Sequence, residues 1–245
     1  ANWKIGSENF GGDAYHVAMT HRSTVELGLS PKDPLFTSYG HQVVLDQGHS
    51  MSVITKSPKL GPTPPYQGQP DELWANFERN LTPEQLDVWR DAAVFHGTCF
   101  PNLSFLSPMH GAGGHAHLTN FLTLRQWRPI GPDKVEIWSW FLTDREAPEE
   151  FKKESYKRYV ATFGPAGTLE QDDVEIWTRI TAASKGLMAR DKDLSYGNVM
   201  NYVMGLDRVD PDPDWPGPGT AYPTTFMEAA QRSFYEVWNS LLMVD

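Results

Sequence analysis

Two histidines and a carboxylate stand close together near the start of the chain. Asn9, Asp13, His16 and His21 fall within thirteen positions, among small and apolar neighbours. Two histidines this close in sequence can bind one metal ion from one side, which leaves coordination positions for a distant carboxylate and for substrates. Two histidines and one carboxylate on a single face suit the Fe(II) of non-haem oxygenases. The stretch is therefore a candidate half of a metal site, which a carboxylate elsewhere in the chain has to complete.

The spacing of the two histidines constrains the backbone that carries them. Residues 12 to about 27 have a pattern typical of a helix, closed by Gly28 and Pro31. The five-residue separation of His16 and His21 corresponds to about 140° around a regular helix. An undistorted helix would point the two imidazoles apart, so a shared metal requires the helix to bulge or end between them.

A second cluster of acids opens a later helix. After a Gly/Pro break, Thr168 is a plausible cap, and Glu170, Asp172 and Asp173 follow in the first part of the helix. A carboxylate in the first turn of a buried helix is held rigidly, as a metal ligand should be. Acids at a helix N-terminus also simply complement the helix dipole. Spacing alone therefore leaves both interpretations open, and it leaves the two histidines open to being ordinary surface or core residues.

The rest of the chain predicts helices around an antiparallel sheet. We expect a strand end at residues 3–5 and β-rich runs at 42–54, 99–106, 118–127 and 135–142, the last three forming a meander. Residues 107–116 are expected to form a flexible loop. Helices are expected after Thr82, which is a good N-cap before Pro83, at 147–162, from Thr168, and from Thr224 or Thr225 to about residue 242.

Composition limits the classes of function. With 245 residues and 40% hydrophobic content, the chain can bury a large core as one domain or at most two. A net charge of -10 argues against nucleic acid and anionic membranes as partners. No run approaches the roughly 20 apolar residues of a membrane span. The single Cys99 excludes an internal disulfide framework, fits a reducing cytoplasm, and excludes an iron–sulfur cluster held by this chain alone.

Taken together, the two motifs resemble the α subunit of Rieske-type aromatic-ring-hydroxylating dioxygenases, most closely the naphthalene and polycyclic aromatic hydrocarbon branch. The resemblance implies an α+β fold, the helix-grip (START/Bet v 1-like) catalytic domain, over residues 1–245, with an antiparallel sheet around a pocket, flanking helices and a long C-terminal helix. The residues that carry it are Glu8, Asn9, Phe10, Asp13, His16, His21, Phe163, Gly164, Pro165, Ala166, Gly167, Asp172 and Asp173, with Phe100, Pro101, Asn102, Trp127, Arg128 and Pro129 in support.

The resemblance also implies roles for individual residues. It makes His16, His21 and Asp173 the iron ligands. Asn9 matches a catalytic-site residue close to the iron. Asp13 matches the catalytic acid that links a ligand histidine to the Rieske cluster of the neighbouring subunit, where a carboxylate fixes the tautomer of the imidazole. The substrate-binding positions that it implies are Asn9, Phe10, Val17, His96, Leu106, Trp127, Phe163 and Leu169.

The function that the resemblance implies is cis-dihydroxylation of an aromatic hydrocarbon by O2 at a mononuclear Fe(II). Electrons would come from NAD(P)H through a reductase, a ferredoxin and a Rieske cluster, in a cytoplasmic α3 or α3β3 assembly with no nucleic-acid or membrane partner. The Cys/His pairs of a Rieske domain are absent from this sequence. We therefore expect the chain to be the C-terminal catalytic part of a longer α subunit, whose [2Fe-2S] cluster this chain does not bind.

Two alternatives come from other classes of protein. One is a non-catalytic helix-grip protein that binds a hydrophobic ligand without metal. The other is a zinc hydrolase that uses the same ligands with a bound water, for which Asp13 is the only obvious general base. Metal analysis separates the first from the oxygenase, because a non-catalytic protein would hold sub-stoichiometric iron that is insensitive to His16→Ala.

Overall fold

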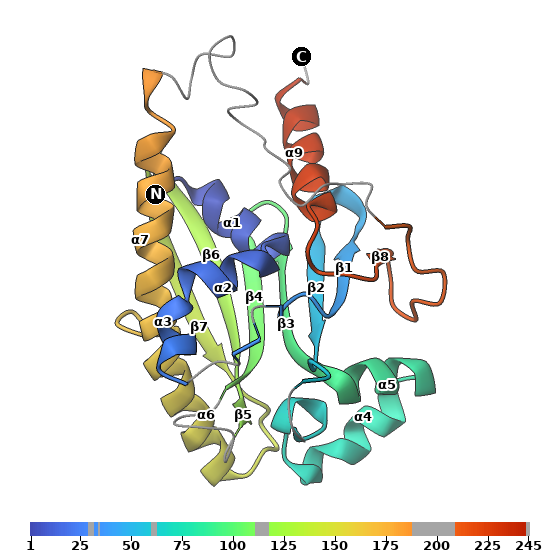
Figure 1. Ribbon diagram of the computed structural model, residues 1–245. Coiled ribbons are helices and arrows are strands. Elements are labelled where there is room, and N and C mark those ends of the chain that lie inside the picture. Colours follow the sequence, from blue (N-terminus) through green and yellow to red (C-terminus); the bar gives the residue numbers. More distant parts are fainter. Residues whose placement is uncertain (29–31, 34, 60–62, 111–117, 188–208, 244–245) are drawn as a thin grey trace.

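The frame of the molecule is one antiparallel sheet, seen in a computed structural model that describes residues 1–28, 32–33, 35–59, 63–110, 118–187 and 209–243. Neighbouring strands follow the order β7-β6-β4-β3-β2-β1-β8, and β5 pairs with β4 (Figure 1). The strands are β1 (Gly40–Val44), β2 (Ser50–Thr55), β3 (Ala92–Cys99), β4 (Leu103–His110), β5 (Thr119–Asn120), β6 (Leu122–Gly131), β7 (Lys134–Leu142) and β8 (Thr220–Tyr222).

Helices cover the sheet and close its ends. The α-helices are α1 (Trp3–Gly12), α2 (Val17–Thr20), α3 (Arg22–Glu26), α4 (Trp74–Asn80), α5 (Pro83–Asp91), α6 (Glu149–Thr162), α7 (Thr168–Ala183) and α9 (Ala229–Leu242). Short 3-10 turns are η1 (Ala14–His16), η2 (Asp46–Gly48), η3 (Tyr66–Gly68) and η4 (Asp71–Leu73). Figure 1 shows α1 and α2 crossing the sheet, with α7 along one side and α9 beside α1. Within the described residues, every helix is too short or too polar to cross a lipid bilayer.

The first helix replaces the strand expected at residues 3–5, so that prediction was wrong. The side chain of Asn2 caps α1 by accepting from the backbone N–H of Lys4 at 3.0 Å. Trp3 and Phe10 on this helix join the hydrophobic core, and α1 packs across β2, β3, β4 and β6. Three residues of alternating polarity are too few to define a strand. A capped helix that buries two aromatic rings is more stable than a strand in this place.

Residues 42–54, expected as one strand, form the two antiparallel strands β1 and β2 joined by η2, and the remaining predicted elements are present with shifted ends. Thr82 caps α5 with a capping box and Pro83 follows it, as predicted. The predicted meander corresponds to β4, β6 and β7. The expected loop at 107–116 is wrong for residues 107–110, which belong to β4, and residues 111–117 lie outside the described part. Gly167 rather than Thr168 is the N-cap of α7, and α9 starts at Ala229, several residues after the predicted threonine cap.

A close approach fixes α1 on the sheet. Trp127 on β6 is 1% exposed, packs edge-on against Phe10 and Trp177, and donates its indole N–H to the Ser104 hydroxyl at 2.8 Å. A Cβ atom added to Gly6 on α1 would lie 2.6 Å from the Trp127 ring. Only glycine therefore lets the helix come this close to the ring.

We predict that Gly6→Ala destabilises the fold by about 1–3 kcal/mol, because the buried indole has little room to move. Chemical unfolding of the purified protein measures the change. Gly131→Ala is the matched control, since an added Cβ there meets only Lys134 at 3.8 Å. Equal stability of the two variants would contradict the close packing of α1 on Trp127.

A buried histidine joins α1 to the sheet and makes stability depend on pH. His96 on β3 is 7% exposed, and its Nδ1 lies 2.7 Å from the Phe10 carbonyl. Burial lowers the pKa of His96 to about 4, against the opposing effect of that hydrogen bond. Between pH 6.5 and about 4 the unfolded chain therefore binds a proton that the folded chain does not.

The free energy of unfolding should fall as pH drops through this window, by at most about 3 kcal/mol from His96. His96→Asn, which keeps a donor near the position of Nδ1 but does not titrate, should flatten this part of the pH profile. Urea unfolding at pH 7 and pH 4.5 measures the difference between the two proteins. Parallel profiles would show that His96 is not the group responsible.

Candidate metal centre

The backbone breaks twice where the histidines stand, as a shared site requires. The helix expected over residues 12–27 is divided at Asp13 and again at His21, where α2 ends and α3 begins. His21 has φ -101° and ψ 29° and caps α2 through its N–H to the Val17 carbonyl. The imidazole centroids of His16 and His21 therefore come within 5.2 Å of each other. The five-residue spacing becomes compatible with one site because the helix ends between the two rings.

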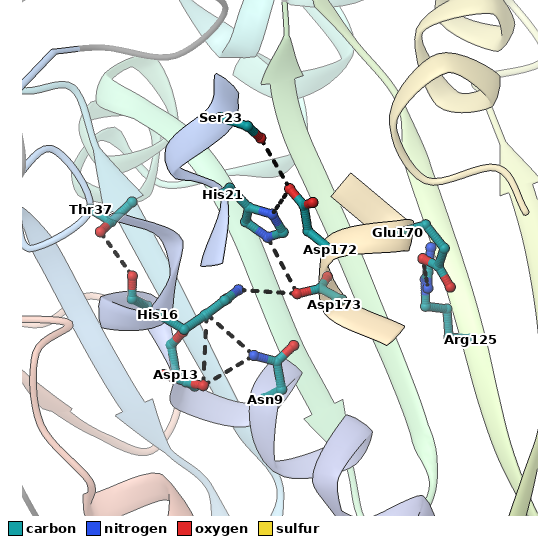
Figure 2. Close-up of polar contacts among 11 residues, drawn as sticks. Asn9, Asp13, His16, His21, Ser23, Thr37, Arg125, Glu170, Asp172 and Asp173 are labelled. Carbon is teal, nitrogen blue, oxygen red and sulfur yellow. Dashed lines mark hydrogen bonds and ion pairs between the residues drawn. The ribbon is translucent and has the colours of Figure 1, made fainter. Parts of the chain in front are cut away.

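The third member comes from α7, which packs against α2. Oδ1 of Asp173 lies 3.6 Å from Nε2 of His16 and 3.3 Å from Nε2 of His21 (Figure 2). One ligand atom from each residue falls within 4.8 Å of the others. Asp172 and Asp173 lie in the second turn of α7 rather than the first, which holds Glu170. The structure thus brings the three predicted ligands together and directs Asp173, not Asp172, between the imidazoles.

The cluster fits a transition-metal cation. Asp173 is 3% exposed, yet its Oδ1 has no hydrogen-bond partner within the described residues. Atoms that share a metal at about 2.0–2.2 Å stand roughly 3–3.6 Å apart, and the observed separations are 3.3 and 3.6 Å. Such an unpaired buried oxygen is costly unless another group satisfies it. Two imidazole nitrogens and one carboxylate oxygen on one face suit Fe(II).

The electrostatics of the cluster keep its carboxylate ionised. Burial alone would raise the pKa of Asp173, but the two imidazoles outweigh it and lower the pKa to about 2. Burial alone would lower the pKa of His16, and the carboxylates of Asp13 and Asp173 outweigh it and raise the pKa to about 9. The Asp173 carboxylate and the His16 imidazole thus each favour the charged form of the other.

Neighbouring groups hold the far side of each imidazole. Nδ1 of His21 lies 3.4 Å from the Asp172 carboxylate, which also accepts from the Ser23 hydroxyl. Nδ1 of His16 lies against the Asp13 carbonyl oxygen, and Thr37 donates to the Ala14 carbonyl at 2.8 Å (Figure 2). These acceptors favour a proton on each Nδ1, so that Nε2 is the nitrogen available to bind a cation.

Asn9 and Asp13 lie beside His16, as the resemblance implied. The Asn9 amide donates to Oδ2 of Asp13 at 3.1 Å and lies 3.2 Å from Nδ1 of His16. Oδ2 of Asp13 is 3.7 Å from the same nitrogen. Burial raises the pKa of Asp13, although His16 and Asn9 pull it back. Oδ1 of Asp13 is buried without a hydrogen-bond partner in the described part of the chain.

The residues assigned to the pocket wall come from several elements, and most of them pack together in the interior. His96 on β3 lies opposite Leu106 on β4, and Val17 directly follows His16. His96 stays predicted as a pocket residue, although its Nδ1 is occupied by the Phe10 carbonyl. One hydrophobic cluster contains Phe10, Leu106, Trp127, Phe163 and Leu169.

The sequence did not reveal a buried ion pair close to the candidate ligands. Arg125 on β6 and Glu170 on α7 meet with 2.5 Å between Nη1 and Oε2 (Figure 2). The available signal was the alternation of β6, where Thr123, Arg125 and Trp127 are all buried. An arginine that shares the inward-facing side of a strand with its neighbours at i-2 and i+2 predicts a buried acidic partner. The pattern does not tell which acid that partner is.

The comparisons with known proteins agree with this geometry. Residues 1–243 match the family model of the ring-hydroxylating α subunit, catalytic domain. A solved structure, naphthalene 1,2-dioxygenase from Rhodococcus sp. bound to indole, superposes with a TM-score of 0.90 at 46% identity, over 99% of this chain and 54% of that one. The helix-grip α+β fold is therefore confirmed.

Curated relatives match the chain over almost its whole length. The α subunit of N,N-dimethyl phenylurea N-demethylase from Sphingobium sp. (strain YBL2) is 29% identical over 100% of this chain and 53% of its own. The α subunit of biphenyl 2,3-dioxygenase from Rhodococcus jostii (strain RHA1) is 30% identical over 97% of this chain and 49% of its own. The chain spans about half the length of these relatives, and it belongs to the family of ring-hydroxylating oxygenase α subunits, whose catalytic domain it matches.

Proposed function

We propose that this chain is the iron-binding catalytic domain of an α subunit that catalyses cis-dihydroxylation of an aromatic hydrocarbon by O2. The observation that carries the proposal is the convergence of three ligand atoms on one point from two distant segments. His16 and His21 come from the broken N-terminal helix and Asp173 from α7. The 46% identity to a naphthalene dioxygenase supports ring dihydroxylation over the N-demethylation named for the 29% identical relative.

His16, His21 and Asp173 would hold a ferrous ion through Nε2, Nε2 and Oδ1. When bound, this ion supplies the activation of O2, which no protein side chain provides. Three protein ligands on one face leave the remaining positions for substrates. The chain's own contribution is to hold these atoms at fixed separations through Asp172, the Asp13 carbonyl and Thr37.

The apolar residues beside the ligands would bind and orient the aromatic ring. Phe10 on α1 and Leu169 on α7 belong with Phe163 to one buried hydrophobic cluster, which would keep water away from a bound ring. Orienting the bound ring would contribute much of the rate enhancement, because a reaction between two separate molecules then becomes a reaction within one complex. The substrate that we propose is an aromatic hydrocarbon with few polar groups, since these walls offer mostly apolar surface.

The wider system would supply electrons and neighbouring subunits. We infer that NAD(P)H provides the electrons, which pass through a reductase, a ferredoxin and the Rieske [2Fe-2S] cluster of an α3 or α3β3 assembly. The support is that the relatives are α subunits about twice the length of this chain. Asp13 is the proposed link between that cluster and His16, because its Oδ2 lies 3.7 Å from Nδ1 of His16 and its side chain is 23% exposed.

The two alternative functions account for less of what is observed. A non-catalytic helix-grip protein has no need of a buried carboxylate whose Oδ1 faces two imidazoles and, within the described residues, makes no hydrogen bond. A zinc hydrolase could use the same three ligands, but the chain belongs to an oxygenase family. Asp13, the only base that the sequence offered for hydrolysis, contacts the far side of His16 rather than the ligand side.

Removal of a ligand should abolish iron binding. We predict that Asp173→Asn and His16→Ala each lower the affinity for Fe(II) by more than the 10–100-fold that loss of an outer partner typically costs. Anaerobic Fe(II) titration followed by metal analysis measures both the affinity and the stoichiometry. Glu175→Gln, which changes an exposed acid on the same helix, is the matched control and should bind one ion per chain as the unmodified protein does. Sub-stoichiometric iron in the unmodified protein, unchanged by His16→Ala, would contradict the proposal.

Asp13→Asn should separate iron binding from turnover. In the full-length subunit with its reductase and ferredoxin, we expect this variant to keep iron and substrate binding while multiple-turnover product formation falls at least about tenfold. The amide fills the same space but lacks the charge next to His16. Glu26→Gln, which removes an exposed carboxylate on neighbouring α3, is the control and should remain active. Full activity of Asp13→Asn would remove the proposed role in electron transfer.

A further inference from the structure

A charged pair lies in the apolar interior close to the candidate ligands. The side chains of Arg125 and Glu170 are 1% and 9% exposed, and their ion pair joins β6 to α7. The guanidinium carbon of Arg125 also lies 5.3 Å from the ring centroids of Phe10 and Phe163. Burial of two charges is expensive, and an apolar pair of similar volume is often as stable or more so. Stability alone therefore does not explain why an ion pair occupies this place.

The arginine attaches to both sides of one chain connection. Nη2 of Arg125 donates to the Phe163 carbonyl at 3.0 Å, and Phe163 is the C-cap of α6. Its Nη1 donates to Glu170 in the first turn of α7. The residues between these two points, 164–167, link the helices. A single guanidinium on the rigid sheet therefore fixes both the end of α6 and the start of α7.

The start of α7 determines where the candidate carboxylate ligand lies. Glu170 and Asp173 are three residues apart, so they share one helix face, and both are buried. Burial raises the pKa of Glu170, and the negative charge of Asp173 adds to this, while Arg125 opposes it. A shift or rotation of the first turn would therefore move Oδ1 of Asp173 relative to the two imidazoles.

We propose that Arg125 and Glu170 are positioning residues for the metal site: their ion pair, with the Phe163 carbonyl, sets the place of Asp173 between His16 and His21. This inference rests on the proposed function, since it concerns the same three ligands. It assigns to the pair a role in metal affinity that is separate from its role in the stability of the fold.

A paired substitution separates the two roles. Arg125→Met leaves Glu170 buried and unpaired, so it should lower both the melting temperature and the affinity for metal. Arg125→Met combined with Glu170→Leu keeps the net charge and restores an apolar interior, so the melting temperature should return. The affinity should remain weakened by on the order of 10–100-fold, the usual cost of losing an outer partner of a ligand.

Cobalt(II) is the probe, because its visible spectrum reports both binding and coordination geometry. Titration of the purified chain gives the affinity, and thermal unfolding of the metal-free protein gives the stability. The control removes an exposed pair that β6 forms with β7, Arg128→Met with Glu136→Leu, whose ion pair is 2.8 Å long, and this variant should bind cobalt(II) as the unmodified protein does. Arg125→Lys, which keeps the charge but cannot span both acceptors, should change the spectrum of bound cobalt(II).

Two results would overturn the inference. One is affinity in the double variant equal to that of the unmodified protein, which would make the pair a purely structural one. The other is an unchanged cobalt(II) spectrum and affinity in Arg125→Lys. Failure of the unmodified protein to bind one cobalt(II) per chain, or equal binding by Asp173→Asn, would instead count against the proposed function itself.

Discussion

The arrangement of the site depends on one buried carboxylate placed between two imidazoles. Oδ1 of Asp173 is out of reach of solvent and lacks a hydrogen-bond donor within the described residues, at 3.3 and 3.6 Å from the histidine nitrogens. An unsatisfied buried oxygen is tolerated only where its surroundings strongly determine its position. The breaks at Asp13 and His21, the contact of α2 with α7 and the anchor from Arg125 all serve to determine it.

The sheet makes such placement possible because it is the rigid frame on which the segments that carry the site are packed. Helix α1 lies close to β6 through Gly6 and Trp127, and it carries Asn9 and Phe10 to the edge of the candidate centre. Helix α7 reaches the same point from the other side, held by Arg125. Gln42 on β1 donates to the Gly12 carbonyl, four residues before His16, and Arg125 on β6 pairs with Glu170, three residues before Asp173. The sheet is therefore attached close to two of the three candidate ligands.

Much of the site was open to prediction because its residues are near one another in sequence or belong to a motif. The spacing of His16 and His21 required a broken helix, and the helix is broken there. The choice of Asp173 over Asp172 came from the family resemblance, since two adjacent acids on one helix are equivalent by pattern. Their positions distinguish them: Asp173 approaches Nε2 of His21, and Asp172 approaches Nδ1 of the same ring.

What the sequence could not supply are contacts between distant positions and the ends of elements. Arg125 and Glu170 are 45 residues apart, with no local pattern that connects them. Residues 3–5 form a helix rather than a strand because a cap at Asn2 and the burial of Trp3 outweigh local alternation. Burial of the Trp3 ring depends on tertiary packing, which overrides the local secondary-structure preference of so short a segment.

The two-segment origin of the candidate ligands has a consequence for the stability of the whole chain. His21 lies 151 positions before Asp172, and Asp173 follows directly, so a cation held by His21 and Asp173 would act as a cross-link that closes a very long loop. Such a link restricts the unfolded ensemble much as a disulfide does, and the restriction grows only slowly with loop length. In a chain with a single cysteine, the metal would take the place of a covalent bridge. Release of the ion would then loosen the short helices α2 and α3 first, because segments of four and five residues have little helical stability of their own.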